Sequence, residues 1–416
     1  MKFIELFAGI GGFRYGLERV CFKNERQPEM PSSGDTEGQP KQLLGECSER
    51  LYDCVWANEW DKYAAQIYRK KFGEGELYEG DITKINPRDI PDHDLLVGGF
   101  PCQAFSIAGK RAGFDDTRGT LFFEVARILR DRRPRCVLLE NVKGLLSHDG
   151  GKTFQTILKV LSDIGYTVEW QILNSKNFGV PQNRERVFIV GHLRGESTGQ
   201  IFPIGESDEK SSGSLGLQGT RQIACSLRAT DYKGTHNNIR EKARGSYIMR
   251  DGRDNRSCLR AGRTPVLNTC GGGNTEGKFI IKANTKKGYE EVKEGDSLNL
   301  SVPSSKTRRG RVGKGVSQTI DTGMHQHTIK DMRIRRLTPT ECERLQGFPD
   351  GWTEGLSDTQ RYRCLGNAVT TNVITAIGAK IIQNENPALV GAVTKQGGKD
   401  EFRTANRKTS RCARED

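Results

Sequence analysis

The sequence predicts an α/β fold, with one large domain built on a mostly parallel sheet and a smaller, irregular β-rich domain. In the first half of the chain, short apolar runs typical of buried strands alternate with segments of helical period, as in parallel sheets. After about residue 193 the sequence becomes glycine-rich, polar and basic, with little helical pattern. The length of 416 residues leaves room for two domains, or for one large domain with an insertion.

The composition indicates which kind of partner the protein binds and in which cellular compartment it is expected. Lysine and arginine total 65 against 52 acidic residues, a formal net charge of +13, which suits a polyanionic partner, although many basic proteins only have solvated charged surfaces. The N-terminus lacks a signal-peptide layout, and no apolar run approaches the roughly 20 residues that span a bilayer. The 11 cysteines include no Cys-x-x-Cys pair, which argues against disulfides and structural zinc. We therefore expect a cytoplasmic protein with reduced thiols, no metal and no membrane contact.

A glycine turn at residues 8–12 joins a predicted strand at residues 3–7 to a helix at residues 13–20. Small residues in such a turn let the backbone approach a ligand at the start of the helix. Arg14 stands where the last glycine of Gly-x-Gly-x-x-Gly would be, which counts against a dinucleotide. S-adenosylmethionine (AdoMet) carries no phosphate and does not need that pattern. Residues 24–50 are polar and aperiodic, and we interpret them as a surface-loop insertion.

Acidic residues follow the next two predicted strands. The strand at residues 52–57 ends at Glu59, which lies about 20 residues beyond the glycine turn once the insertion is left out. An acid at that distance commonly binds ribose hydroxyls, whereas an acid at a helix start, stabilised by the helix dipole, is the alternative interpretation. Asp81 again places an acid at the end of a short strand.

One cysteine occupies a loop at the end of the predicted strand at residues 94–97. Gly98 and Gly99 end the strand, and Pro101 stiffens the backbone before Cys102. Open α/β sheets place their ligands at the carboxyl ends of their strands, where an ionised thiol can act as a covalent nucleophile. A half-buried structural cysteine is the competing interpretation.

A carboxyl group and two arginines are predicted near this thiol. Glu140 ends the strand at residues 136–139, which one crossover helix joins to the cysteine strand. If a pyrimidine lies in the cleft, thiolate addition at carbon 6 makes carbon 5 nucleophilic, and an acid near ring nitrogen 3 stabilises the adduct. Arg184 and Arg186 could hold the carbonyl oxygen of the base or a phosphate, or they could form a surface charge cluster with Glu185.

The C-terminal third returns to helical patterns after the basic segment, whose arginines suit phosphate binding or an ordinary solvated face. Thr338 is predicted to cap a helix that begins with Pro339. Gly366 is predicted to open a last apolar helix that runs to about Ile382. The charged, polar tail beyond is expected to be disordered.

These motifs, in this order, resemble those of the DNA (cytosine-5) methyltransferase family over nearly the full chain outside the insertion and the tail. The resemblance implies AdoMet as cofactor and S-adenosyl-L-homocysteine as product. The catalytic residues that it implies are Cys102, Glu140, Arg184 and Arg186. The cofactor-binding residues that it implies are Phe7, Gly9, Gly11, Gly12, Glu59, Trp60, Asp81, Ile82, Pro101, Leu121, Asn367 and Val369. The DNA-contacting residues that it implies are Gln103, Ser106 and Thr319.

The same resemblance implies an arrangement of domains. A Rossmann-like, AdoMet-dependent methyltransferase domain is expected at residues 1–193, completed by residues 356–386, and a target-recognition domain at residues 194–355. Residues 387–416 form the expected disordered tail. The target cytosine of double-stranded DNA would be flipped out of the helix, because carbon 5 must meet both thiol and methyl donor.

Competing functions share parts of this pattern. A tRNA cytosine-5 methyltransferase would keep the chemistry and change the substrate, but the long basic segment favours duplex DNA. A catalytically inactive DNA-binding protein is disfavoured by Cys102, Glu140 and Arg186, and a dehydrogenase by Arg14. We expect a monomer on DNA in the cytoplasm of a prokaryote, with a role in restriction–modification beside a separate cognate endonuclease or in epigenetic methylation. The sequence does not predict the DNA target.

Overall fold

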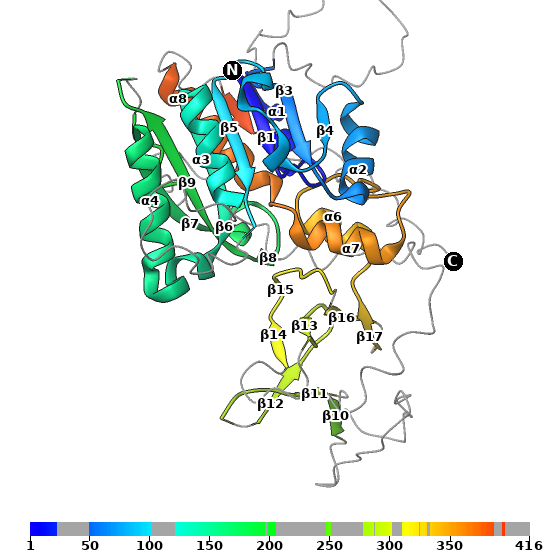
Figure 1. Cartoon of the computed structure of the whole chain (residues 1–416). Helices are drawn as coiled ribbons and strands as arrows, with labels where there is room; N and C mark the ends of the chain where they lie inside the picture. The colour runs from blue at the N-terminus through cyan, green and yellow to red at the C-terminus, as the bar shows by residue number, and fades with distance from the viewer. Residues whose placement is uncertain are drawn as a thin grey trace, which may run out of the picture.

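The computed structural model describes residues 1–22, 50–101, 121–195, 199–204, 247–250, 278–286, 288–301, 310–323, 325–330, 333–386 and 393–395. A central seven-stranded sheet organises the described part of the chain (Figure 1). Its strands, in spatial order, are β4 (Leu77–Glu79), β3 (Asp53–Glu59), β1 (Lys2–Leu6), β5 (Leu95–Gly99), β6 (Cys136–Val142), β9 (Glu185–Leu193) and β7 (Tyr166–Asn174). All neighbouring pairs are parallel except the two that involve β9. The predicted α/β class and mostly parallel sheet are confirmed.

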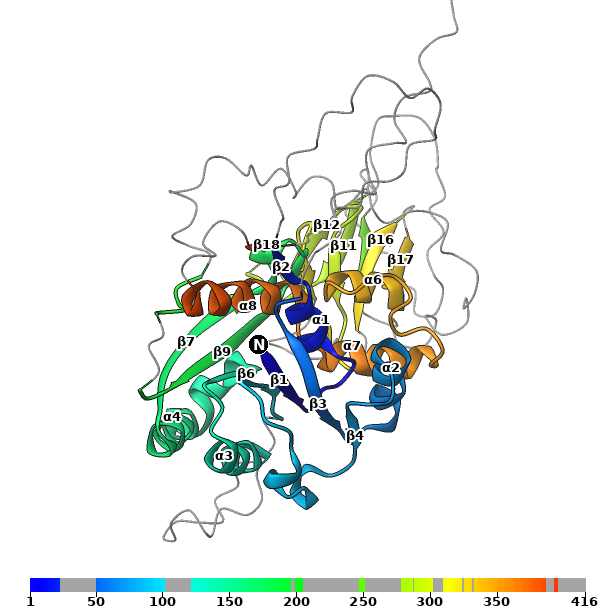
Figure 2. The ribbon, with the colours of Figure 1, turned by 90° about the horizontal axis from the view of Figure 1, so that it is seen from above.

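Helices cover both faces of the sheet, and the strands are buried on both sides for that reason. Phe3 belongs to one apolar cluster and its neighbour Ile4 to the other, as the two-residue period of a strand requires. The first cluster includes α1 (Gly12–Glu18) and α8 (Thr371–Glu385), and the second includes α3 (Leu121–Arg132) and α4 (Lys152–Ile164). Figure 2 shows these two pairs of helices on opposite sides of the strands.

The last helix of the described chain, α8, returns to the beginning of the chain and packs on α1. Gly16 of α1 lies so close to α8 that a Cβ atom there would stand 2.6 Å from Cβ of Ile374. The Thr375 hydroxyl donates to the carbonyl of Gly16 at 2.8 Å, and the Tyr52 hydroxyl donates to the carbonyl of Gly378 at 2.8 Å. The segment 358–385 is apolar enough and long enough to cross a membrane, but 83% of its most apolar window is buried inside the protein, as expected for core helices.

The predicted start of the last helix is wrong. Gly366 and Asn367 end a separate helix, α7 (Asp358–Asn367), and α8 begins only at Thr371. Ala368 between them is extended, with φ −66° and ψ 149°. Its carbonyl accepts hydrogen bonds from the side chains of Arg184 and Gln346, which replace the helical bonds. The helices α7 and α2 (Lys62–Phe72) were not predicted from the sequence.

The β-rich part contains two antiparallel sheets below the large one in Figure 1. Its strands are β10 (Tyr247–Arg250), β11 (Lys278–Lys282), β12 (Tyr289–Val292), β13 (Ser297–Asn299), β14 (Arg311–Gly313), β16 (Gln326–Lys330) and β17 (Arg333–Arg336). Four buried aliphatic side chains form its small core: Ile281, Val292, Leu298 and Ile329. A separate short strand, β15 (Ser317–Gln318), pairs in parallel with β8 (Gln182–Asn183) of the large domain.

The remaining elements join these parts. Thr338 caps α6 (Pro339–Leu345) with the predicted geometry, because its hydroxyl accepts from Glu341 N at 3.2 Å while Glu341 accepts from Thr338 N at 2.8 Å. Leu345 and Phe348 lie within the expected target-recognition domain, but they pack with Ile10 of the glycine turn in the large domain. The domain boundary expected at residue 355 stays a prediction. The other short elements are β2 (Val20–Phe22), β18 (Val393–Lys395) and 3₁₀ turns at Ile82–Lys84, Pro87–Asp89, Lys143–Gly151 and Ser175–Phe178.

Candidate active site

The carboxyl ends of the parallel strands bring most of the predicted site residues to one edge of the sheet. In the strand register, Leu6 of β1 pairs with Asn58 of β3 and with Gly98 of β5. Gly99 of β5 pairs with Glu140 of β6. The glycine turn, Glu59, the Pro101 loop and Glu140 therefore follow one another along a single edge, which is where open α/β sheets hold ligands.

The glycine turn after β1 has an unusual backbone. Phe7, Gly9 and Gly11 have φ of 54°, 56° and 81°, in the left-handed region that favours glycine. A Cβ atom on Gly11 would lie 2.2 Å from the Phe72 ring, so a side chain does not fit there. A Cβ atom on Gly9 would meet no atom within 4 Å, which leaves open space beside the turn. The strained turn therefore borders an open space at the strand ends.

Glu59 connects this turn to the end of β3. Its carboxylate accepts hydrogen bonds from Gly9 N at 2.7 Å, Trp60 N at 2.9 Å and Asp61 N at 2.7 Å. Burial raises the pKa of Glu59, and the three backbone donors partly oppose that rise. The N-cap of α2 is Asp61, two residues after Glu59, so Glu59 does not itself cap the helix. A carboxylate has about four acceptor sites, so three donors leave room for a ligand hydroxyl.

Two further predicted cofactor-binding residues, Trp60 and Asp81, lie near Glu59 in the structure. Trp60 is 77% exposed, which leaves a large aromatic face uncovered. Asp81 follows β4 and accepts from Thr83 N at 3.0 Å, and this bonding lowers the pKa of Asp81. Ile82, the next residue, is buried, and Leu121 is half-buried at the start of α3.

The residues between α7 and α8 reach the same turn. A Cβ atom on Gly12 would lie 2.7 Å from Cγ1 of Val369, so the two backbones approach each other closely. Val369 is buried in this contact, whereas Asn367 is exposed. The structure thus brings Val369 against the glycine turn, although the two are more than 350 positions apart in the chain.

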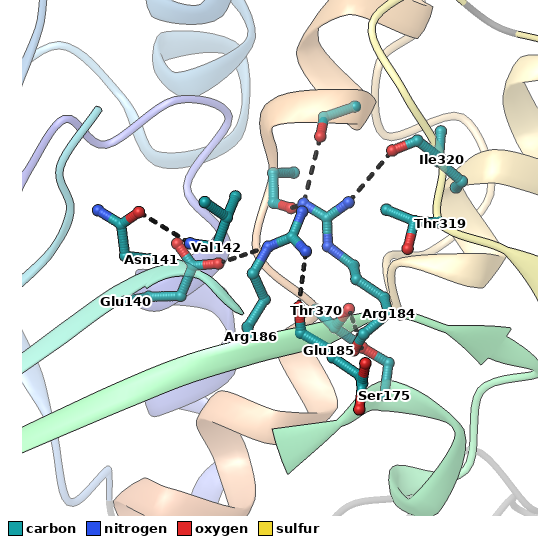
Figure 3. A network of polar contacts seen from close by, with 12 residues as sticks. Glu140, Asn141, Val142, Ser175, Arg184, Glu185, Arg186, Thr319, Ile320 and Thr370 are labelled. Carbon is teal, nitrogen blue, oxygen red and sulfur yellow. Dashed lines mark hydrogen bonds and ion pairs between the residues drawn. The ribbon is translucent and has the colours of Figure 1, made fainter. Parts of the chain in front are cut away.

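Glu140 and Arg186 form an ion pair at the next strand ends, with Arg186 Nε 3.0 Å from Glu140 Oε1 (Figure 3). The side chain of Glu140 is 13% exposed. Burial raises its pKa above the ordinary value for glutamate, and the neighbouring Arg186 cation partly opposes the rise. Glu140 Oε2 would lie only 3.2 Å from a Cβ atom on Gly99, so glycine at this position makes room for the carboxyl group.

Asn141 has a role that the sequence did not indicate. It is buried, and its Nδ2 donates to the carbonyl of Phe100 at 2.8 Å, while its Oδ1 accepts from Val142 N at 2.8 Å. These bonds fix the backbone just before Pro101, which is exposed. The sequence signal that could have indicated this role is the asparagine that directly follows the acid Glu140 at the end of the predicted strand. Cys102, Gln103 and Ser106 lie outside the described residues.

Arg184 has different partners from Arg186, although the two guanidinium groups lie near each other (Figure 3). It is 2% exposed, and its guanidinium donates to the carbonyls of Ile320, Gly366 and Ala368 at 3.2, 3.2 and 2.7 Å. Burial lowers its pKa to about 9, helped by the nearby Arg186 cation. This placement differs from the expected contact with a base or phosphate, because backbone carbonyls inside the protein occupy both terminal nitrogens. Thr319, the predicted DNA contact, donates its hydroxyl to the carbonyl of Asn183 at 2.9 Å.

Comparison with known proteins decides the family. Residues 1–383 match the family model described as C-5 cytosine-specific DNA methylase. The chain belongs to this family. The methylase is 36% identical over 382 residues to the type II methyltransferase M.SsoII of Shigella sonnei, covering 92% of this chain and 80% of that one. It is 32% identical over 381 residues to the type II methyltransferase M.HhaI of Haemophilus parahaemolyticus, covering 92% of this chain and 94% of that one.

Solved structures agree with this assignment at the level of the fold. An E. coli prophage-encoded protein described as a DNA modification methyltransferase aligns with a TM-score of 0.54 and 19% sequence identity, covering 93% of this chain and 99% of that one. The family match and the named relatives support a DNA methylase over the tRNA methyltransferase alternative.

The family is AdoMet-dependent, and the edge of the sheet fits that cofactor. Open space at Gly9, the carboxylate of Glu59 and the exposed ring of Trp60 suit an adenosine group. Arg14, where a dinucleotide fold has glycine, is buried against Phe72 and paired with Glu18 at 2.7 Å. Within the ranges described above, no group of three or more His, Cys, Asp or Glu side chains is placed to hold a metal ion. The expected independence from metals stays a prediction.

Replacing Glu59 with alanine should weaken AdoMet binding by about 10- to 100-fold, because one charge-assisted hydrogen bond contributes roughly 1.5–3 kcal/mol. Isothermal calorimetry on the purified methylase measures the dissociation constant. Asp53→Ala is the matched control, since Asp53 is exposed at the opposite end of the same strand. Equal affinity in Glu59→Ala and Asp53→Ala would show that Glu59 only supports the turn.

Proposed function

We propose that this methylase modifies one cytosine in a specific double-stranded DNA sequence through a covalent adduct between Cys102 and carbon 6 of the base. The observation that carries the proposal is the Glu140–Arg186 pair, which lies beside the strand end that leads to Pro101 and Cys102. The register of β5 and β6 places the carboxyl group next to Gly99, three residues before the thiol. The same edge carries the glycine turn and Glu59.

The chemistry follows from the weak nucleophilicity of carbon 5. Attack by the Cys102 thiolate forms the sulfur–carbon 6 bond and pushes an electron pair towards carbon 5, while ring nitrogen 3 gains a proton. AdoMet, when bound, supplies an electrophilic methyl group for carbon 5. Loss of the carbon 5 proton to a base, departure of the Cys102 sulfur as a thiolate and return of the ring nitrogen 3 proton to its donor then restore the aromatic ring. The residues implied to hold the cofactor are those around the glycine turn, Glu59, Trp60, Asp81 and Val369.

Glu140 is suited to supply the proton at ring nitrogen 3. Its raised pKa keeps the carboxyl group protonated to higher pH than an ordinary glutamate. Arg186 fixes the position of the carboxyl group and is placed to meet the carbonyl oxygen of the base. Asn141 holds Phe100 and thereby the start of the cysteine loop. We propose Arg186 and Glu140 as groups that touch the base, and Asn141 as a positioning residue.

The substrate must leave the duplex to reach this edge. A base within the stack cannot present carbon 6 to a thiol and carbon 5 to a methyl donor, so we infer that the target cytosine is flipped out. We propose that residues 194–355 read the DNA sequence, with Gln103, Ser106 and Thr319 near the target. The excess of basic residues supports contact with phosphates.

The named relatives are type II methyltransferases, which supports a role in restriction–modification. A cognate endonuclease that acts as a separate protein, a monomeric state on DNA and a cytoplasmic, nucleoid-associated location complete this proposal.

Bisulfite sequencing tests the proposal directly. Expression in a host that lacks cytosine-5 methylation should protect one cytosine within one short genomic sequence, and tRNA should stay unmodified. Exchanging residues 194–355 for the equivalent segment of M.HhaI should move the methylation to a different sequence. A chimera that keeps the original target would place recognition elsewhere in the chain, and modification of tRNA instead of DNA would overturn the proposed substrate.

A further inference from the structure

Among the described residues, no acidic side chain lies in hydrogen-bond contact with the buried Arg184 cation. Its terminal nitrogens donate to three backbone carbonyls, and its buried Nε has no hydrogen-bond partner within this part of the chain. Burying a charge costs free energy that carbonyl dipoles only partly offset. An apolar side chain in this space would therefore destabilise the fold less than the arginine does. The arrangement is explained if the role of Arg184 is to hold together the segments that supply the carbonyls.

The first of these segments comes from the β-rich part of the chain. Residues 317–320 run beside β8, where Ser317 N donates to the carbonyl of Pro181 at 2.7 Å. Ile320 N donates to the side chain of Gln182 at 3.0 Å, and the Ile320 carbonyl accepts from Arg184. The segment that includes Thr319 is therefore fixed to β8 and to Arg184, which lies between β8 and the strand β9 that carries Arg186.

The second segment belongs to the cofactor side. The carbonyls of Gly366 and Ala368 flank Asn367, and the next residue, Val369, packs against Gly12 of the glycine turn. Gly366 also lies close to the residues that directly follow the first segment, since a Cβ atom on it would lie 2.6 Å from Thr322 N. A displacement of residues 319–322 would therefore act on residues 366–369 through both this contact and Arg184.

Buried amides surround the same junction. Gln346 donates to the carbonyls of Leu365 and Ala368 at 2.7 and 3.1 Å. The side-chain oxygen of Gln346, Oε1, accepts from the hydroxyl of Thr370 at 2.9 Å and from Gln182 Nε2 at 3.2 Å. Among these side chains, Arg184 is the one that bonds both segments, and a neutral amide cannot replace its fork of donors.

We propose that Arg184 is a positioning residue that couples DNA binding to cofactor binding, by holding residues 319–320 and residues 366–368 in one fixed relation. DNA that fixes the first segment then also fixes the second, and the glycine turn binds cofactor more tightly as a result. The inference rests on the proposed function, because it requires that the segment with Thr319 meets DNA. Coupling of this kind is reciprocal, so cofactor must tighten DNA binding by the same factor.

The test measures the dissociation constant of S-adenosyl-L-homocysteine with and without a duplex that contains the target sequence found by bisulfite sequencing. In wild type the duplex should tighten this binding by at least about 5-fold, the lower end of typical coupling. Arg184→Lys, which keeps the charge but not the fork, and Arg184→Met should bring the ratio close to one. Their binding of S-adenosyl-L-homocysteine without DNA should change less than about 3-fold.

Lys176→Met is the matched control, because it removes a cation near β8 and, among the described hydrogen bonds and ion pairs, Lys176 has none with residues 319–320 or 366–368. It should keep the wild-type ratio. A wild-type ratio of one, or an unchanged ratio in Arg184→Lys, overturns the proposal. An equal loss of affinity with and without DNA would assign Arg184 a purely structural role. Failure of wild type to bind or methylate any duplex would instead overturn the proposed function itself.

Discussion

Replacing Cys102 with serine should abolish methyl transfer while AdoMet binding stays within about 2-fold of wild type. A serine hydroxyl is a far weaker nucleophile at neutral pH than a thiol with appreciable thiolate character, so the bond to carbon 6 does not form. The glycine turn and Glu59 lie at the ends of other strands and should be unaffected. Transfer of tritiated methyl groups to DNA measures the activity, and calorimetry measures the binding.

Cys54→Ser is the matched control for this variant. Cys54 is buried on β3, and burial raises its pKa to about 12, so its thiol is unreactive. The control should keep methylating DNA. DNA with 5-fluorocytosine at the target should trap the wild-type enzyme as a denaturation-resistant complex, because fluorine on carbon 5 cannot leave as the proton does. Trapping of Cys102→Ser at the wild-type yield would show that another group is the nucleophile.

The residues that the sequence could predict lie at the ends of buried strands. Glu59 and Glu140 each follow an apolar run, and the parallel order of the strands suffices to bring them to one edge. Val369 is a different case, because its contact with Gly12 joins distant parts of the chain. That contact was expected only from the family resemblance, since no local pattern encodes it.

The sequence could not predict how the side chain of Arg184 is used. Its partners are backbone carbonyls, which every residue has, so no residue type marks them in the sequence. The same carbonyls explain the wrong start of the last helix, because the bonds to Gly366 and Ala368 interrupt an otherwise helical pattern. The Arg184 placement and the break at Ala368 are one tertiary feature.

Replacing Glu140 with glutamine should lower the turnover number by about 10²- to 10⁴-fold, the usual contribution of a positioned proton donor. Glutamine has nearly the same shape, and its oxygen can still accept from Arg186, so the local structure should persist. The amide can donate a hydrogen bond to ring nitrogen 3, but it cannot transfer a proton. Single-turnover assays with excess enzyme separate this step from product release.

Glu185→Gln is the control, because Glu185 is exposed, adjacent in sequence to Arg186 and paired with Lys143 at 3.0 Å. It should retain wild-type turnover.

The pH dependence of single turnover gives a second, independent measure of the role of Glu140. Burial raises the pKa of Glu140, and only the protonated carboxyl group can donate, so wild-type turnover should fall as pH rises through that raised pKa. Glutamine does not titrate, so this alkaline decline should be absent from Glu140→Gln, whereas Glu185→Gln should keep it. If Glu140→Gln stays within 10-fold of wild type, or shows the same alkaline decline, the proton must come from another group, and the Glu140–Arg186 pair would serve only to hold the base.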